Sequence, residues 1–215
     1  MNTEISVLIK TIGRSSLQDA INSAMREDFT EIIVVADGCS VNVKGAKIIE
    51  LPKRWGFYGA VAANVGIGFC TKSYVLFLDD DDELSIGSGK IIRAKIDNNN
   101  NVDIWIPALL YNDGIIQCDG SVKKVLPGNV AVPICKTEVL ISLPFKSTIP
   151  KRKIFFNSKI PKDINKKTIQ KEQYLEYLDY FYIHEAHQSG YIVDWIGEPI
   201  YLVRPKSKGQ QGRGQ

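Results

Sequence analysis

The chain has 215 residues, of which 44% are hydrophobic and 24% are charged, and this composition excludes a disordered, collagen-like or coiled-coil protein. Its net charge of +3 is too small to indicate nucleic-acid binding, so no nucleic acid is expected as a partner. No apolar run approaches the roughly 20 residues that span a bilayer. Four widely spaced cysteines and two histidines argue against a structural zinc site, and a reduced, cytoplasmic protein is the default expectation.

The first half of the chain alternates short apolar segments with segments of helical periodicity. Apolar residues at 17, 20, 21, 24 and 25 lie on one helix face, and a capping box of Ser16 and Asp19 is expected to start that helix. The predicted strands lie at 5–9, 31–35, 47–51, 74–78 and 102–110, with two further helices at 58–69 and 86–96. This alternation is typical of a doubly wound α/β sheet, whose ligands bind beyond the carboxyl ends of its strands.

The second half of the chain is less regular. Three prolines and many lysines indicate a loop-rich segment, which is followed by a helix that ends at Gly190, a last strand and a flexible tail. These four predicted segments are, in order, 143–167, 168–189, 200–203 and 206–215. Two interpretations of the basic part, 151–167, stay open: a solvated loop, or a peripheral contact with an acidic acceptor or a membrane surface.

Five consecutive acidic residues follow directly on the apolar segment 74–78. They are Asp79, Asp80, Asp81, Asp82 and Glu83. Adjacent carboxylates repel one another, so such a run needs either water or a cation around it. It is therefore either a solvated turn that caps the next helix or a site for Mg²⁺ or Mn²⁺ with the phosphate oxygens of a ligand. Its position at the end of a predicted strand favours the metal–phosphate site.

Three smaller features each have two interpretations. Asp37-Gly38 ends the strand 31–35 and is either a turn or an acceptor of hydrogen bonds from a nucleobase or a ribose. The aromatic residues of the loop 55–58 either pack onto the sheet or stack on a sugar or a base. His184 and His187 lie one helical turn apart and are either surface residues or two ligands of a metal.

Four segments of the first half follow one another in a characteristic order. They are a strand and loop at 5–14, a strand with an acidic turn at 31–39, a glycine–asparagine–glycine helix at 59–66 and a strand with an acidic run at 74–82. The ordered set resembles the motifs of family-2 glycosyltransferases with the GT-A fold. This resemblance implies a single α/β domain with a GT-A-like, doubly wound, mostly parallel sheet. Residues 1–110 would form its nucleotide-sugar-binding half, and 111–205 its acceptor and catalytic half.

The resemblance also implies roles for individual residues. The implied nucleotide-binding residues are Thr11, Arg14, Asp37, Gly59, Asn64, Asp79 and Asp80. Asp37 would bind the uracil edge, and Asp81 would ligate the metal cofactor, Mn²⁺ or Mg²⁺. Three positions depart from the family pattern: Lys10 stands where proline is usual, Ala36 replaces an acid and Cys39 replaces a serine.

The C-terminal half resembles the family in its segments 177–182, 190–193 and 199–204. On this match Asp179 is the general base, although Leu178 stands where the family has glutamate. Glu176 and Glu185 are the alternatives, and an exposed acid on a helix is the other interpretation of Asp179.

The implied reaction is an inverting, metal-dependent transfer of a sugar from a nucleotide sugar, expected to be a UDP-sugar, to an acceptor hydroxyl. The expected acceptor is a glycan or a lipid-linked molecule. Two alternatives stay open. A sugar-phosphate nucleotidyltransferase would carry a G-x-G-T-R loop where this chain has 11–15, Thr-Ile-Gly-Arg-Ser. A catalytically inactive partner protein would bind the nucleotide sugar without turnover.

Overall fold

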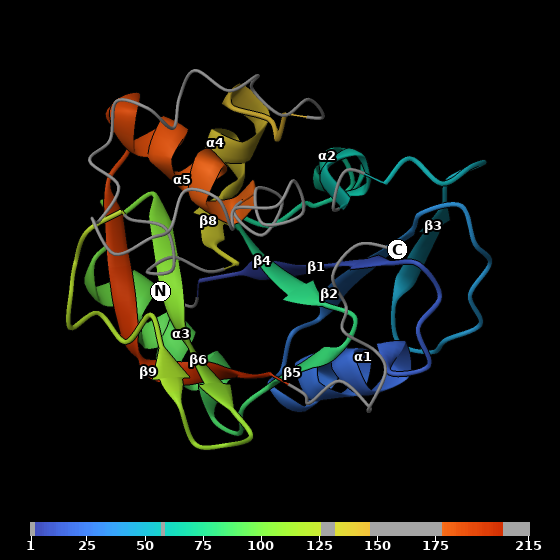
Figure 1. Cartoon of the computed structure of the whole chain (residues 1–215), viewed down its shortest axis with the longest axis horizontal. Coiled ribbons are helices and arrows are strands. Elements are labelled where there is room, and N and C mark those ends of the chain that lie inside the picture. Colours follow the sequence, from blue (N-terminus) through green and yellow to red (C-terminus); the bar gives the residue numbers. More distant parts are fainter. Residues whose placement is uncertain (1–2, 57–58, 126–131, 147–177, 204–215) are drawn as a thin grey trace, which may run out of the picture.

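The computed structural model describes residues 3–56, 59–125, 132–146 and 178–203. Within these ranges nine strands form one sheet, in which β7 pairs with β6 and the others follow the order β3-β2-β1-β4-β8-β6-β9-β5 (Figure 1). The strands are β1 (Ile5–Thr11), β2 (Glu31–Ala36), β3 (Lys47–Glu50), β4 (Tyr74–Asp79), β5 (Asp82–Leu84), β6 (Ile104–Tyr111), β7 (Ile116–Gln117), β8 (Ile134–Lys136) and β9 (Val193–Val203). The helices are α1 (Leu17–Arg26), α2 (Ala60–Ile67), α3 (Ser88–Asn98), α4 (Thr137–Ser142) and α5 (Leu178–Gln188).

The expected doubly wound arrangement is confirmed in the first half of the chain. The strands β3, β2, β1 and β4 lie side by side and are all parallel. The near-continuous apolar sequences of β1, β2 and β4 fit strands that are covered on both faces, whereas β3 is a short edge strand. Beyond β4 the sheet is mixed, because β8 runs antiparallel to both of its neighbours, β4 and β6, whereas β9 runs parallel to β6.

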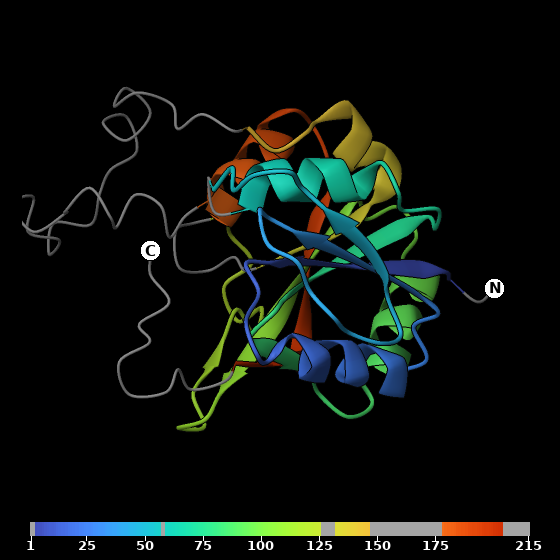
Figure 2. The same cartoon turned by 90° about the vertical axis from the view of Figure 1, so that its right-hand side faces the viewer.

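Two layers of helices cover the sheet (Figure 2). Apolar residues of α1 and α3 pack on one face, together with alternate residues of β1 such as Val7 and Ile9. Residues of α2, α4 and α5 pack on the other face, together with Leu8 of β1 and Phe77 of β4. Successive side chains of a strand point to opposite faces, so each strand contributes to both cores.

Several local predictions differ from the structure. The capping box is wrong: Ser16 makes no side-chain cap and instead donates its hydroxyl to the backbone carbonyl of Asp80, at 2.7 Å. The helix α2 is shorter than predicted, because Gly59 takes a left-handed conformation just before it and the chain turns after Ile67. The short elements β5, β7, β8 and α4 and most of β9 were not predicted, whereas 168–177 of the expected last helix lie outside the described residues.

Candidate active site

The acidic run is divided by the alternation of strand side chains. Asp79, the last residue of β4, pairs in register with Lys10 of β1 on the face that carries α2 and α5. Asp80 lies toward the opposite layer, where it meets Thr11, the last residue of β1, and Arg14, which follows β1. The carboxylates of two consecutive aspartates therefore meet different partners, and their mutual repulsion is reduced.

Asp80 is held inside the protein. Its side chain is only 1% exposed, and it accepts hydrogen bonds from the hydroxyl of Thr11 and the guanidinium of Arg14. Burial raises the pKa of Asp80, and the bonds from Thr11 and Arg14 oppose that rise. Both oxygens of Asp80 therefore have protein partners, Oδ2 with Thr11 and Oδ1 with Arg14, and its role in nucleotide binding stays a prediction.

Asp81 remains partly open to a ligand, as does Asp79, whose side chain is 40% exposed. The Asp81 side chain is 26% exposed, and the nearest cation is the Nε of Arg14, at 3.9 Å from Oδ2. Within the described ranges, no three histidine, cysteine, aspartate or glutamate side chains gather as a metal-binding group. A cation at Asp81 would consequently need most of its oxygen ligands from a bound molecule or from water.

The second half of the chain contributes Asp179, which interacts with Lys10 and Asp79 at the ends of β1 and β4. Asp179 lies in the first turn of α5, one turn before the buried residues Tyr182 and Ile183. Burial raises the pKa of Asp179 to about 6, against the opposing attraction of Lys10, while Asp79 adds to the rise. The structure therefore brings Lys10, Asp79 and Asp179 into one electrostatic group, and a carboxyl with a pKa shifted in this way is a candidate for acid–base chemistry.

The alternative Glu185 does not join this group. Glu185, two turns further along α5, makes an ion pair with Lys146 at 2.5 Å on an exposed part of the surface. Glu176 lies outside the described residues. Of the two histidines on the same helix, His184 stacks on Tyr180 with ring centroids 5.4 Å apart, and His187 is exposed.

Asp37 directly follows β2, and its side chain is hydrogen-bonded to the loop that follows β3. Its carboxylate accepts the backbone N–H groups of Trp55 at 2.7 Å and of Gly56 at 2.8 Å. Gly38 has a φ of +71°, and a Cβ atom there would lie 2.1 Å from the backbone nitrogen of Arg54. Trp55 is 43% exposed next to this turn, and the Nζ of Lys53 lies 4.1 Å from the centroid of its ring, so an aromatic surface partly covered by Lys53 lies beside Asp37. Phe57 and Tyr58 lie outside the described residues.

Two other predicted nucleotide-binding residues have packing partners. Gly59 lies against Lys10, since a Cβ atom on it would come within 2.9 Å of the Lys10 Cδ. Asn64 is bonded in both directions to the backbone of Phe145, at 2.7 and 2.9 Å, and so ties α2 to the segment after α4. The structure uses the Asn64 amide for this link rather than aiming it at the acidic run.

Lys10 was not predicted as a site residue. The signal for it was a lysine at the carboxyl end of an otherwise apolar strand, at a position where the resembling family has proline. Burial alone would lower the pKa of Lys10, but the carboxylates of Asp79, Asp179 and Asp80 raise it, so Lys10 carries a positive charge at the centre of the site.

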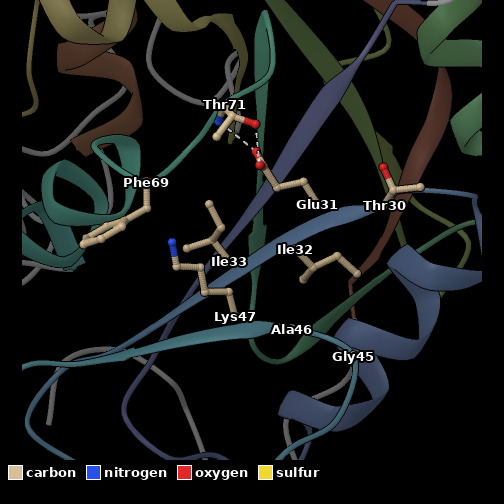
Figure 3. Close-up of a pocket in the computed structure, with 9 residues that line it drawn as sticks. All are labelled: Thr30, Glu31, Ile32, Ile33, Gly45, Ala46, Lys47, Phe69 and Thr71. Atoms are coloured by element: carbon tan, nitrogen blue, oxygen red, sulfur yellow. Dashed lines mark hydrogen bonds between the residues drawn. The ribbon is translucent and has the colours of Figure 1, made fainter.

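A cavity of about 220 Å³ lies elsewhere, between the first residues of β2 and β3 (Figure 3). Glu31 and Thr71 face each other across part of it and are hydrogen-bonded, while Lys47 lies over the ring of Phe69 at 4.7 Å. The amino ends of parallel strands are not where ligands of such sheets bind, so the carboxyl edge remains the candidate site.

Among the described helices, none is both long and apolar enough for a membrane span.

Comparisons with known proteins agree with this location. The profile of the family described as "Glycosyl transferase family 2" matches residues 6–118, which include the acidic run. Among solved structures, S. aureus TarS 1-349 has a TM-score of 0.67 and 17% identity over 94% of this chain. The same protein in complex with UDP scores 0.66 at 17% identity over 93% of the chain, and in complex with UDP-GlcNAc 0.63 at 16% over 99%.

This likeness shows a shared GT-A fold. The chain covers 60%, 60% and 62% of the three TarS 1-349 structures, so it spans about three-fifths of their length. No curated protein sequence matches the chain.

Proposed function

Because the chain belongs to glycosyl transferase family 2, we propose that it is a metal-dependent, inverting glycosyltransferase that moves a sugar from a UDP-sugar to an acceptor hydroxyl. The observation that carries this proposal is the group of charges formed by Lys10, Asp79 and Asp179, which come from both halves of the chain, with Asp81 two residues after Asp79. The TarS complexes with UDP and UDP-GlcNAc support the choice of donor.

The donor is proposed to lie along the ends of β1, β2 and β4. Asp37, with the exposed face of Trp55 beside it, is assigned to the uracil, and Asp79 to the ribose. The half-exposed carboxylate of Asp81 fits Mn²⁺ or Mg²⁺, since hard cations combine one or two carboxylates with phosphate oxygens. Such an ion, when bound, supplies positive charge that stabilises the leaving diphosphate.

Asp179 is assigned to accept the proton of the acceptor hydroxyl. The acceptor oxygen forms a bond to the anomeric carbon on the side opposite the diphosphate, and the bonding pair of the broken C–O bond leaves with UDP. One such displacement inverts the anomeric configuration. With a pKa of about 6, the Asp179 carboxyl is ionised at neutral pH and yet basic enough to take up the proton as the new bond forms.

The proposed acceptor is a glycan or a lipid-linked molecule. The basic segment 151–167, which is a candidate contact with an acidic acceptor or a membrane surface, lies outside the described residues. Its role is a separate prediction and does not affect the assignment of the donor site.

Calorimetric titration with UDP, in Mn²⁺ and in EDTA, tests the donor and the metal together. We expect tighter binding in Mn²⁺, and we expect Asp81→Ala to remove the difference between the two conditions. Glu138→Gln is the matched control, because it removes an exposed carboxylate on α4, far along the chain from the acidic run, and should keep that difference. Equal UDP affinity with and without Mn²⁺ would refute the metal site. UDP binding without UDP release from a panel of UDP-sugars and glycan acceptors would instead indicate an inactive binding protein.

A further inference from the structure

Lys10 is a charged side chain embedded between two elements of the site. It lies directly across from Asp79 in the parallel pairing of β1 with β4, and its Nζ is 3.5 Å from Oδ1 of Asp79. Its stem passes against Gly59, where a side chain of any size would collide with it. The Lys10 side chain is only 19% exposed, so its position is defined by packing as well as by charge.

The helix α5 packs over the face of the sheet that carries Lys10 and Asp79, since Tyr182, one turn after Asp179, stacks on Phe145, which meets Phe77 of β4 edge to face. The titratable groups that interact electrostatically with Asp179 come from four strands: Lys10 of β1, Asp79 of β4, Cys135 of β8 and Tyr201 of β9. Burial raises the pKa of both Cys135 and Tyr201, so these two groups are neutral at physiological pH and offer no charge to Asp179. Asp79 repels it. Within the described part of the chain, Lys10 is the cation that attracts it.

We propose that Lys10 is a positioning residue that holds the carboxylates of Asp79 and Asp179 together across the two halves of the site. An ammonium group has three donors and a full charge, so it can serve two carboxylates that would otherwise repel each other. The structural part of this proposal stands on the ion pair of Lys10 with Asp79 and on the packing of α5 over the same face of the sheet. Its catalytic meaning rests on the proposed function, in which Asp79 belongs to the donor site and Asp179 is the base.

The consequence concerns the protonation of Asp179. A buried carboxyl beside another carboxylate favours its neutral form, and a nearby cation favours its charged form. Loss of the Lys10 charge therefore leaves Asp179 with burial and Asp79 alone, both of which favour protonation. Without Lys10, a larger fraction of Asp179 would carry a proton at neutral pH and could not act as a base.

Carboxyl ¹³C NMR tests this without needing turnover. The Asp179 signal is assigned by its absence in Asp179→Asn, and its titration is followed in wild type, Lys10→Met, Lys10→Arg and Lys72→Met. Lys72 is the matched control, because it is similarly covered, at 23% exposed, and pairs with Glu4 at 3.0 Å away from the site. We expect the Asp179 midpoint to rise by about one pH unit in Lys10→Met, to return most of the way in Lys10→Arg, and to stay unchanged in Lys72→Met.

The acid limb of kcat/KM for sugar transfer should move in the same direction and by a similar amount. An Asp179 midpoint that is the same in Lys10→Met and in wild type, with both proteins folded by circular dichroism, overturns the proposal. A midpoint that rises in Lys10→Met and returns in Lys10→Arg supports it, even if no UDP-sugar is turned over, in which case only the proposed function fails.

Discussion

Replacing Asp179 by asparagine should make the protein more stable at alkaline pH while removing its proposed base. Burial raises the pKa of Asp179 from 3.8 to about 6, and this rise measures how strongly the folded protein disfavours the carboxylate. Asparagine has nearly the same shape and no charge at any pH. The variant therefore separates the burial of a charge from the packing of a side chain.

The size of the effect follows from the pKa. A rise of the pKa from 3.8 to about 6 corresponds to a loss of about 3 kcal/mol in the free energy of unfolding at pH values above both. Because the folded pKa is the higher one, the folded protein binds the proton more tightly, and the Asp179 carboxylate destabilises the fold increasingly as the pH rises through this interval. Because the side chain of Asp179 is only partly buried, solvent screens its charge and reduces this figure. We therefore expect Asp179→Asn to raise the free energy of unfolding by about 1 to 3 kcal/mol at pH 8. Near pH 3.5, where the carboxyl is largely protonated in both states, the gain should vanish.

Urea unfolding at the two pH values measures this difference. Glu185→Gln is the control, since it removes a carboxylate from the same helix at an exposed ion pair, and it should change stability by no more than about 1 kcal/mol. In parallel, the transfer rate of Asp179→Asn should fall by roughly 10² to 10⁴, with UDP affinity retained. An Asp179→Asn protein that is no more stable than wild type at pH 8 would refute the argument that Asp179 is ionised against the preference of the fold.

Two further outcomes are expected. Gly38→Ala should lower the free energy of unfolding in urea by about 2 to 4 kcal/mol, because it adds left-handed strain and a clash with the Arg54 backbone. Gly114→Ala, at φ +83° with open space around it, should show the strain alone and lower the free energy by about 1 kcal/mol. Equal losses at the two glycines would contradict the clash. If 151–167 contacts membranes, the full chain should co-sediment with anionic but not neutral vesicles at low salt, since each lysine near such a surface contributes about 1 kcal/mol to binding. A variant with neutral residues at the lysines of 151–167 should stay in the supernatant. Wild-type protein that also stays in the supernatant would leave the solvated loop as the correct interpretation.

The sequence was most informative where one local signal decides the structure. The apolar runs of β1, β2 and β4 identify buried parallel strands, and the acids that follow β2 and β4 mark the candidate site. The ordered motifs of the first half also identified the family, whose profile matches 6–118. All of these signals lie within short stretches of chain.

The structure departs from the sequence prediction where distant residues decide. The sequence of the acidic run does not indicate β5, because β5 is a strand only through its pairing with β9. The burial of Asp80 depends on partners more than sixty residues away, Thr11 and Arg14. Lys10 becomes a site residue only because β4 and α5 bring carboxylates to it. No local pattern encodes such contacts.

The pairing of β5 with β9 has a consequence for how the protein is made. Asp82–Leu84 pair with Tyr201–Val203, so the acidic run is fixed on one side by β4 and on the other by a strand synthesised more than half a chain later. A nascent chain that has released the whole nucleotide-sugar motif still lacks the strand that holds its acidic turn, and this distant pairing is a slow kind of contact to form. The order of synthesis thus delays a finished donor site until Tyr201–Val203 have been made, and a stop before Tyr201 would leave a product with every donor-site residue of the first half present and the turn between β4 and α3 unanchored.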